Sequence, residues 1–337
     1  MSENQLNITM LFDKSYPLPS SCLGQVRVIN TRLNVIDASA ISEAARKGNR
    51  LSQKTLDDIL ARTDIFFGMF DPKVLVAKAP NLKWVQHPMS GVDIFGFPEF
   101  VKSDILLTNA SGIHGVQVGE MAIWHMISLA KNTRRICEDM RKRRTQLFKP
   151  VVLFGKTACI LALGPIGKYI AKLCHGFGMK VIAVEADSKV KCRYCHTIYS
   201  VKQLHLALVQ ADVVIDCLPL LDSTNEIMGE KEFMKMKKTA FFINVGRGGT
   251  VDQDALIRAL KEGTIAGAGL DVKTPEELPP DHPLWKLLNV TLTPHMGGQH
   301  PDYTQLATNL FCRNLKRYLA GRKMLTQIDK KTLKPIP

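Results

Sequence analysis

The sequence lacks any long uninterrupted apolar run, and it opens without the basic segment and apolar core of a signal peptide. Its longest apolar stretches have the length of buried strands, far short of the roughly 20 residues that span a membrane. Eight cysteines are scattered through the 337 residues. Without an export signal they are expected to be free thiols in a reducing cytosol, not a disulfide framework. These absences favour a cytoplasmic protein with no membrane association.

Aromatic residues are sparse at 7%, whereas 45% of the chain is hydrophobic and 23% is charged, as in an ordinary globular protein. A length of 337 residues is too great for one small core and fits two domains. Acidic residues are in deficit, with 31 Asp and Glu against 45 Lys and Arg, and the net charge is +14. Such a positive charge is compatible with binding to nucleic acid, to an anionic membrane or to anionic small molecules. The net charge alone does not distinguish these partners.

Much of the positive charge lies in residues 131–149, where eight basic residues outweigh Glu138 and Asp139. Two interpretations of this run stay open: a solvated helix face, or a cationic surface that attracts anionic substrates. Nucleic-acid binding is the weaker hypothesis, because no recognisable reading module and no interleaved aromatic residues accompany the run.

The first 109 residues alternate short apolar runs with helical stretches, which predicts a small α/β domain. Its expected strands are NITMLF, TDIFFGMF, NLKWVQH and DILLTN, and its clearest helix covers residues 51–61. A long amphipathic helix is expected next, over residues 115–135. One face of it would carry Val118, Met121, Ala122, Met126 and Leu129.

After Gly155 the alternation of strand and helix starts again. The expected strands are TACILAL, MKVIAVE, ADVVIDCL, TAFFINV, IAGAGLDV and VTLTP. Such a series builds a doubly wound parallel sheet, which binds its ligands at the carboxyl ends of the strands. A closing helix is expected over residues 302–321, and the tail IDKKTLKPIP is expected to be frayed and solvated.

The segment CILALGPIGKYIAK approaches the G-x-G-x-x-G turn of dinucleotide-binding proteins. Ala162 stands where the first glycine belongs, while Gly164 and Gly167 keep the other two positions. An alanine would still form the turn if its φ stayed negative. Glu185 ends the next strand, 23 positions after Ala162, where a carboxylate can accept hydrogen bonds from the ribose hydroxyls. The alternative is a strand–helix–strand unit that binds nothing.

Three further segments resemble the NAD-dependent D-2-hydroxyacid dehydrogenases, which include glyoxylate and hydroxypyruvate reductases: AFFINVGRGGTVDQDAL, AGAGLDVKTPEELPPDHPLW and VTLTPHMGG. The resemblance extends from about Lys83 to Gly298, and the first eighty residues match only in rhythm. It implies a Rossmann-type cofactor domain, residues 110–300, inserted in a flavodoxin-like substrate domain made of residues 1–109 and 301–337. The active site would lie in the cleft between the domains.

The resemblance also implies an oxidoreductase that transfers a hydride between NAD and a 2-keto acid or D-2-hydroxy acid. Its catalytic residues would be Arg247, Glu276 and His295. Since a histidine has an unperturbed pKa of about 6.5, His295 could give and retake the substrate proton near neutrality. Glu276 would orient the ring and favour its charged form. Arg247 would grip the substrate with a two-pronged geometry that a lysine lacks.

The substrate site implied by the family combines Arg247 and His295 with backbone amides around Ser90 and Gly91. Asp271 is the residue that faces the nicotinamide in this family. The implied cofactor contacts are Ala162, Gly164, Pro165, Ile166, Gly167, Glu185, Leu218, Pro219, Val245, Gly246, Asp271, His295 and Gly297.

NAD is expected to be preferred to NADP, because the carboxylate of Glu185 would repel a 2′-phosphate. NADP is not excluded, since Lys189, Lys191 and Arg193 follow closely and could offset that repulsion. Which 2-keto acid is used, and in which direction, stays open at this stage.

Two positions depart from the family pattern. Glu277 stands where the pattern P-E-P-L-P has its second proline, which makes it a competitor of Glu276, although the spacing favours Glu276. Lys273 replaces the small or apolar residue that commonly follows L-D-V, so the nature of the pocket wall stays open.

The segment Cys192-Arg-Tyr-Cys195-His196 matches the C-x-x-C-H pattern of covalent haem attachment. Such attachment normally needs an exported chain, so the match is interpreted as coincidence. No metal site is expected.

A homodimer is implied by the family, built through the long helix from about Val118 and the arm after it, because the amphipathic face would need a cover. Arg141 to Arg144 would then attract anionic substrates. The alternative to an enzyme is a corepressor-like protein of the same fold that binds partners and senses the nucleotide. The sequence does not separate the two, since such a protein can keep the catalytic residues.

Overall fold

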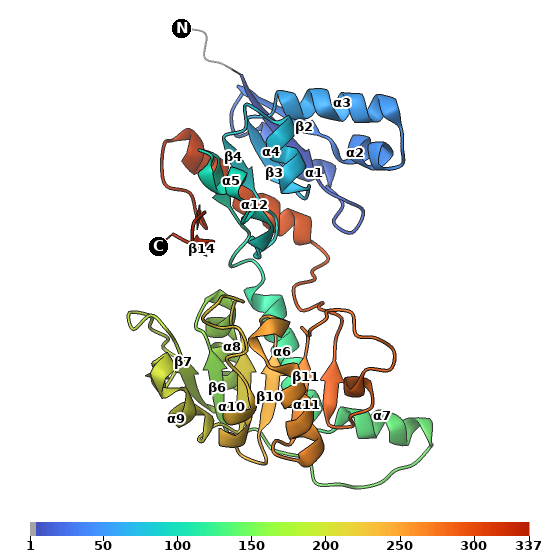
Figure 1. The fold of residues 1–337 in the computed structure, drawn as a ribbon, viewed down its shortest axis with the longest axis vertical. Coiled ribbons are helices and arrows are strands. Elements are labelled where there is room, and N and C mark those ends of the chain that lie inside the picture. The colour runs from blue at the N-terminus through green and yellow to red at the C-terminus, as the bar shows by residue number, and fades with distance from the viewer. Residues whose placement is uncertain (1–4, 337) are drawn as a thin grey trace. The chain divides into compact units, whose positions relative to one another are not determined.

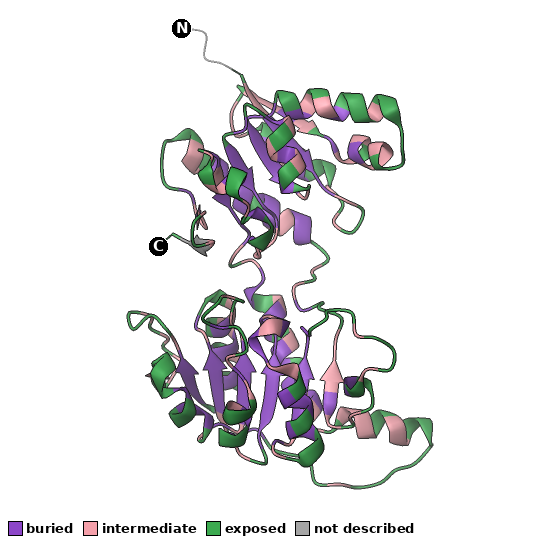
Figure 2. Cartoon of the chain, viewed as in Figure 1, coloured by how far each residue is buried: buried purple, intermediate pink, exposed green. Residues whose placement is uncertain are grey.

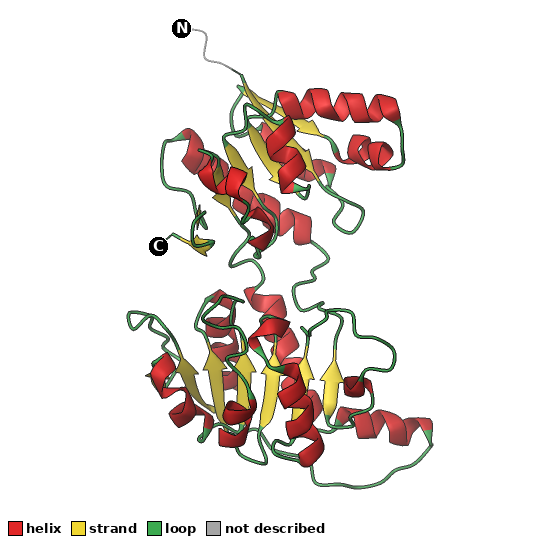
Figure 3. Cartoon of the chain, in the orientation of Figure 1, coloured by secondary structure: helices red, strands yellow, loops and turns green. Residues whose placement is uncertain are grey.

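The computed structural model describes residues 5–336. The chain divides into two compact units, the first made of Met1–Ile113 with His300–Pro337 and the second of His114–Gln299. Each unit has its own parallel sheet, and helices flank the sheet in each (Figures 1 and 3). The α/β class predicted from the sequence is confirmed, with a flavodoxin-like sheet in one unit and a Rossmann-type sheet in the other.

The first unit contains five parallel strands in the order β2-β1-β3-β4-β5, which is the order of flavodoxin-like folds. The strands are β1 (Leu6–Leu11), β2 (Leu33–Asp37), β3 (Ile65–Gly68), β4 (Trp84–Gln86) and β5 (Leu106–Thr108). The helices are α1 (Ser20–Arg27), α2 (Ser39–Arg46), α3 (Arg50–Ala61), α4 (Pro72–Lys78), α5 (Pro98–Lys102) and α12 (Tyr303–Leu319), with a 3₁₀ turn η1 (Asp93–Phe95).

Successive residues of β1 pack into different hydrophobic cores, one on each face of the first sheet. Met10 of β1 packs in a cluster with Phe311 of α12, whereas the next residue, Leu11, joins a cluster with Leu60 of α3. This alternation follows from the period of two in a β-strand. The last helix of the chain thereby completes the core that the first strand begins.

The second unit contains seven parallel strands in the order β12-β11-β10-β9-β6-β7-β8. The strands are β6 (Thr157–Leu161), β7 (Lys180–Val184), β8 (Thr197–Tyr199), β9 (Val213–Asp216), β10 (Phe241–Asn244), β11 (Gly267–Leu270) and β12 (Val290–Leu292). The helices are α6 (Gly115–Ala130), α7 (Thr133–Arg141), α8 (Pro165–Gly176), α9 (Leu204–Leu208), α10 (Glu230–Lys235) and α11 (Gln253–Glu262), with 3₁₀ turns η2 (Val201–Gln203), η3 (Gly248–Thr250) and η4 (Pro283–Trp285).

The central strands of the second sheet, β6, β9 and β10, are buried on both faces (Figure 2). Cys159 of β6 joins the core beneath α9, α10 and α11, whereas the adjacent Ile160 joins the core beneath α6 and α8. Since the crossover helices cover both faces, the strands consist of nearly continuous apolar residues, as parallel strands usually do. The sheet therefore offers only its edges to a ligand, and its carboxyl edge is the one that matters below.

The long helix expected over residues 115–135 is two helices in the structure. Asn132, between α6 and α7, has a left-handed backbone with φ of 49°, and its side chain accepts a hydrogen bond from the Arg135 N–H at 3.4 Å. Asparagine tolerates this conformation better than most residues, which explains the break. The predicted apolar face packs on its own sheet, with Val118, Ala122 and Met126 buried there. The expectation that this face needs a partner to cover it is wrong.

Within the tail expected to be frayed, residues 328–336 contain a short two-stranded sheet. Strand β13 (Ile328–Asp329) pairs antiparallel with β14 (Lys334–Pro335), and Ile328 is buried in the first unit's core. One apolar residue in a polar stretch gives no periodic signal, so the sequence pattern missed it. In the part of the chain that the structure describes, no helix is long and apolar enough to cross a membrane.

Candidate active site

The carboxyl ends of the second sheet gather the predicted cofactor residues at one edge. All seven strands are parallel, so the loops that follow them share that edge. Ala162, Gly164, Pro165, Ile166 and Gly167 follow β6, Glu185 follows β7, Leu218 and Pro219 follow β9, Val245 and Gly246 follow β10, Asp271 follows β11, and His295 and Gly297 follow β12. Ser90 and Gly91 belong to the first unit, where the Asn109 Nδ2 donates to the Ser90 carbonyl oxygen at 2.6 Å.

The glycine-rich turn has a geometry that the sequence did not predict. Ala162 has a φ of 76°, in the left-handed region, so the condition that its φ stay negative is not met. Gly167 of α8 packs directly against this residue. A Cβ on Gly167 would come within 2.0 Å of the Ala162 carbonyl oxygen. The helix can approach the strand this closely only with glycine at 167.

No neighbouring atom of the protein requires the second residue of the motif, Gly164, to be a glycine. Gly164 is the N-cap of α8, and a Cβ built on it would meet no atom within 4 Å. Its outer side is therefore open at the N-terminus of a twelve-residue helix, where backbone N–H groups attract phosphate. This arrangement fits a dinucleotide pyrophosphate, which needs a backbone without a side chain at this point.

Glu185 lies against the same turn. One carboxylate oxygen accepts a hydrogen bond from the Leu163 N–H at 2.7 Å, and the other accepts one from the Ala186 N–H at 2.8 Å. The acid at the end of β7 is thus fixed beside the turn at the end of β6, as ribose recognition requires.

His295 and Glu276 are brought together by two loops of the second unit. The His295 Nδ1 lies 3.2 Å from a Glu276 carboxylate oxygen, and both side chains are 48% exposed. His295 has a φ of 52°, and its N–H donates to the Asp271 carbonyl oxygen at 2.9 Å. Since Nδ1 faces the carboxylate, Nε2 is the ring nitrogen left to serve a substrate.

Asp271 holds the loop that carries His295. It is buried, and one of its carboxylate oxygens accepts hydrogen bonds from the Thr293 hydroxyl at 2.6 Å and the Met296 N–H at 3.0 Å. The other accepts from the Gly297 N–H at 2.8 Å. The Asp271 carboxylate therefore fixes the loop both before and after His295 and so holds this residue in place.

Arg247 follows β10 and is half-buried. Its guanidinium donates to the Gly246 carbonyl oxygen at 2.8 Å. The Arg247 carbonyl oxygen in turn accepts from the Asn244 side-chain amide at 3.0 Å and from the Thr250 hydroxyl at 2.7 Å. The backbone at Arg247 is thereby fixed, while most of its five N–H donors stay open to a ligand.

Asp216 and Thr250 form a buried pair that sequence reasoning missed. The Thr250 hydroxyl donates to Asp216 at 2.6 Å, and the Leu218 N–H donates to the other Asp216 oxygen at 2.8 Å. Burial raises the pKa of Asp216 to about 6. The pair ties the loop after β9 to the turn after Arg247. An aspartate that ends an apolar strand carries no motif, so only the structure shows this role.

A second missed group lies under the His295 loop. The Lys273 ammonium is buried and donates to the Thr293 carbonyl oxygen at 2.8 Å. His125 of α6 lies between the hydroxyls of Thr291 at 2.7 Å and Thr293 at 3.1 Å. Burial lowers the pKa of His125 to about 4, so this ring is neutral at pH 7. Lys273 therefore supports the loop from the end of β11. The contacts of His125 offer no sequence signal, because they depend on how α6 packs on β12.

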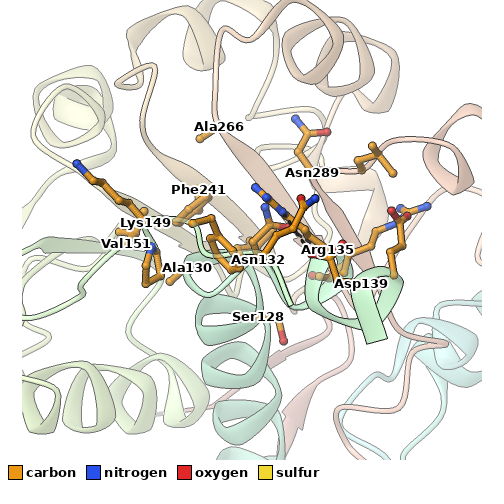
Figure 4. A pocket seen from close by; sticks show the side chains of 18 residues that line it. Ser128, Ala130, Asn132, Arg135, Asp139, Lys149, Val151, Phe241, Ala266 and Asn289 are labelled. Atoms are coloured by element: carbon orange, nitrogen blue, oxygen red, sulfur yellow. Dashed lines mark hydrogen bonds and ion pairs between the residues drawn. The ribbon is translucent and has the colours of Figure 1, made fainter. Parts of the chain in front are cut away.

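The hollow shown in Figure 4 lies away from these residues. A groove of about 570 Å³ is bounded by the end of α6, the start of α7 and the amino ends of β10 to β12 (Figure 4). Phe241, Ala266 and Asn289 mark those amino ends. The groove thus belongs to the edge opposite the catalytic candidates, and its volume says nothing about catalysis.

Comparison with known proteins agrees with this geometry. Residues 123–297 match the model of the NAD-binding domain of D-isomer-specific 2-hydroxyacid dehydrogenases. A glyoxylate reductase of Thermofilum pendens is 36% identical over 276 residues, 79% of this chain and 80% of that protein. A glyoxylate/hydroxypyruvate reductase B of Enterobacter sp. is 35% identical over 236 residues, 66% of this chain and 71% of that protein.

A solved structure extends the likeness to nearly the whole chain. The crystal structure of a D-isomer-specific 2-hydroxyacid dehydrogenase family protein from Aeromonas salmonicida has a TM-score of 0.81 at 28% identity and covers 97% of this chain and 100% of that one. The chain belongs to the D-isomer-specific 2-hydroxyacid dehydrogenase family. It is an oxidoreductase that uses NAD(P), and its substrates fall in the class of small keto and hydroxy acids.

Proposed function

We propose that this enzyme reduces a small 2-keto acid to the D-2-hydroxy acid, with His295 as the proton donor. The observation that carries the proposal is the 3.2 Å contact between His295 and Glu276 at the carboxyl edge of the cofactor sheet. An imidazole oriented by a carboxylate is the group best suited to proton transfer near neutrality.

Each of three side chains has a distinct part in the proposed reaction. The reduced nicotinamide supplies the hydride when bound. His295 gives its Nε2 proton to the keto oxygen of the substrate as the hydride reaches the carbonyl carbon. Glu276, on the Nδ1 side, stabilises the ring while it carries the charge. Arg247 binds the substrate carboxylate, since a guanidinium matches two oxygens at once.

The cofactor is proposed to be NADH in preference to NADPH. Glu185 is fixed beside the glycine-rich turn, where its charge would accept bonds from ribose hydroxyls and repel a 2′-phosphate. Lys189, Lys191 and Arg193 are exposed on the following loop and reduce that repulsion. We expect kcat/KM to be higher with NADH, and comparable values with the two cofactors would refute the preference.

A panel of 2-keto acids, from glyoxylate to bulky branched acids, tests the activity most simply. Consumption of NADH and of NADPH is followed separately at 340 nm, a wavelength at which only the reduced cofactors absorb. Saturable turnover of at least one small 2-keto acid is expected. Dinucleotide binding without turnover of any acid would favour the corepressor-like alternative, in which the nucleotide is a signal for partner binding.

The enzyme is further proposed to be a homodimer. The apolar side chains Trp124, Met140, Leu147 and Val152 are exposed on α6, α7 and the arm after it. Trp124 lines a hollow beside α7, and the other three adjoin in sequence residues that line the groove of Figure 4. A second copy would cover them, because monomers rarely leave such surface open. Light scattering at micromolar concentration is expected to give twice the chain mass, and the mass of one chain would refute the dimer.

Part of the basic run at residues 131–149 makes structural contacts. The Arg134 guanidinium donates to the carbonyl oxygens of Leu287 and Trp285, and the Arg135 guanidinium lies 4.8 Å from the centre of the Phe148 ring. These contacts fix α7 and the segment after it to the second unit. Arg141 and Arg143 are exposed and are the residues proposed to attract anionic substrates, so neutralising both is expected to lower kcat/KM at low salt only.

A further inference from the structure

The segment that joins β7 to β8 contains two cysteines at the ends of a tight turn. The Cys195 N–H donates to the Cys192 carbonyl oxygen at 3.1 Å, which closes a four-residue turn. The two cysteines therefore occupy the first and fourth positions of this turn. None of the activity proposed above uses this pair.

The turn has the geometry that a disulfide needs. A β-turn brings its first and fourth Cα atoms within about 7 Å, and disulfides form at Cα separations of about 4.4–6.8 Å. The turn therefore places the two cysteines within the Cα separation at which a disulfide can form. A metal is not the explanation for the pair, since the described residues contain no group of three or more His, Cys, Asp or Glu side chains placed to hold one.

The surroundings of the pair leave it reachable and keep it in place. Cys192 and Cys195 are partly exposed, whereas Cys159 and Cys174 beside them are buried. Both turn cysteines also pack on the core beneath α8, together with Tyr194. A small oxidant therefore reaches the thiols without unfolding, and the packing keeps them together.

The charges on the loop indicate which oxidant it favours. Lys191 and Arg193 flank Cys192 in the sequence, and both are exposed, as is Lys189. A cationic loop concentrates anionic reagents near it. Small disulfides that carry carboxylates, such as oxidised glutathione, match this charge.

We propose that Cys192 and Cys195 form a reversible dithiol–disulfide site that small-molecule disulfides oxidise. The Cys192 thiolate attacks one sulfur of the oxidant, which leaves a mixed disulfide and releases one thiol. The Cys195 sulfur then attacks the Cys192 sulfur, forming the internal disulfide and releasing the second thiol. Two protons and two electrons pass from the protein to the oxidant. The site does not depend on the proposed catalytic residues.

The order of attack follows from burial. Desolvation by burial raises the pKa of Cys195, which makes this thiol the weaker nucleophile at neutral pH. Cys192 therefore forms the mixed disulfide, and Cys195 resolves it. A ring closed by so short a loop gains little from chain entropy, so the bond is expected to be readily reduced again.

The test is peptide mapping of the whole protein after equilibration with oxidised glutathione. Free thiols are alkylated in denaturant, and the chain is cleaved after lysine, which releases residues 192–202 as one peptide with both cysteines. This peptide is expected to be unalkylated and two hydrogen atoms lighter than the reduced form. Dithiothreitol should restore alkylation at both positions.

Three variants sharpen the result. Cys195→Ser should accumulate a glutathione adduct on Cys192, because the resolving thiol is gone, and Cys192→Ser should abolish the internal disulfide. Cys137→Ser, which removes an exposed cysteine elsewhere, should leave the internal disulfide unchanged. Full alkylation of Cys192 and Cys195 in the wild-type peptide, under conditions that modify Cys137, would overturn the proposal.

Discussion

Ala162 shows how one residue can keep a function at a cost in stability. The backbone of Ala162 has a left-handed conformation. Glycine adopts this conformation freely, whereas it costs other residues about 1–2 kcal/mol. Gly164 and Gly167, which approach the ligand and the strand, are kept. The turn therefore retains its shape, and the substitution acts on the free energy of unfolding and not on the ligand-facing backbone.

Ala162→Gly is expected to raise the free energy of unfolding by about 1 kcal/mol, since the strain removed exceeds the extra entropy of the unfolded glycine. Denaturant titration measures the change. Gly263, the left-handed end of α11 with a φ of 70°, provides the mirror control: Gly263→Ala should destabilise by a similar amount. A less stable Ala162→Gly protein would contradict this account of the turn.

Glu276 is expected to act on the charge of His295 and not only on its position. Glu276→Gln keeps the size of the side chain but removes the negative charge 3.2 Å from the ring. Above neutrality kcat for reduction should fall roughly tenfold, a part of the 10²–10⁴ that a positioned acid contributes. The charged ring loses its partner in this variant, and steady-state kinetics with saturating NADH measures the loss of kcat.

The matched control is Glu277→Gln, one position along the same loop, where the residue is also exposed. Its kcat for reduction should equal that of the wild type. If the two variants lower kcat equally, the effect comes from the charge of the loop and not from the pair.

Among the elements, β9 and the turn after β10 are linked by a buried acid. The pKa of Asp216 is raised by burial from 3.8 to about 6. Between these values the folded chain holds a proton that the unfolded chain has lost, so the stability contribution of this group is complete below about pH 4 and falls as pH rises through 6. The Thr250 hydroxyl and Leu218 N–H offset part of the penalty above that pH.

Asp216→Asn is expected to remove this pH dependence. The wild type should lose about 3 kcal/mol of stability relative to the variant as pH rises from about 4 to about 7, the equivalent of a shift of about two pKa units. Urea unfolding of both proteins across that range measures the difference. A difference that stays constant with pH would show that Asp216 does not titrate as its burial implies.

The elements that the sequence predicted best are those with strong apolar patterns. The central strands β6, β7, β9 and β10 consist almost wholly of buried apolar residues. Their apolar runs in the sequence were enough to predict strands. The strands β2 and β8 were missed, because edge strands are half-exposed and mix polar with apolar residues. The break at Asn132 was missed because it depends on the φ of one residue.

The candidate site was predictable to the extent that motifs carried it. Spacing alone selected Glu276 in preference to Glu277, and the structure places Glu276 beside His295. The supporting groups were not predictable. His125 reaches the His295 loop only through the packing of α6 on the sheet, and Lys273 reaches it only because β11 and β12 are neighbours. Neither relation leaves a pattern along the chain.

Across the whole molecule, one parallel sheet brings residues from six separate loops to a single edge. The glycine-rich turn and Glu185 form the part of that edge suited to a dinucleotide, and the His295–Glu276 pair forms the part suited to proton transfer. The central claim is that these two parts act together in the reduction of a 2-keto acid, with His295 as the acid.

The most direct test of that claim is the reduction rate of His295→Ala beside its affinity for NADH. We expect kcat to fall by about 10²–10⁴, while the dissociation constant of NADH, from fluorescence titration, stays within about twofold because the glycine-rich turn is untouched. His205, which contacts Glu232 at 2.8 Å on the surface of the same unit, gives a matched control, and His205→Ala should retain wild-type kcat. A His295→Ala enzyme that reduces every accepted 2-keto acid at a near-normal rate would contradict the account.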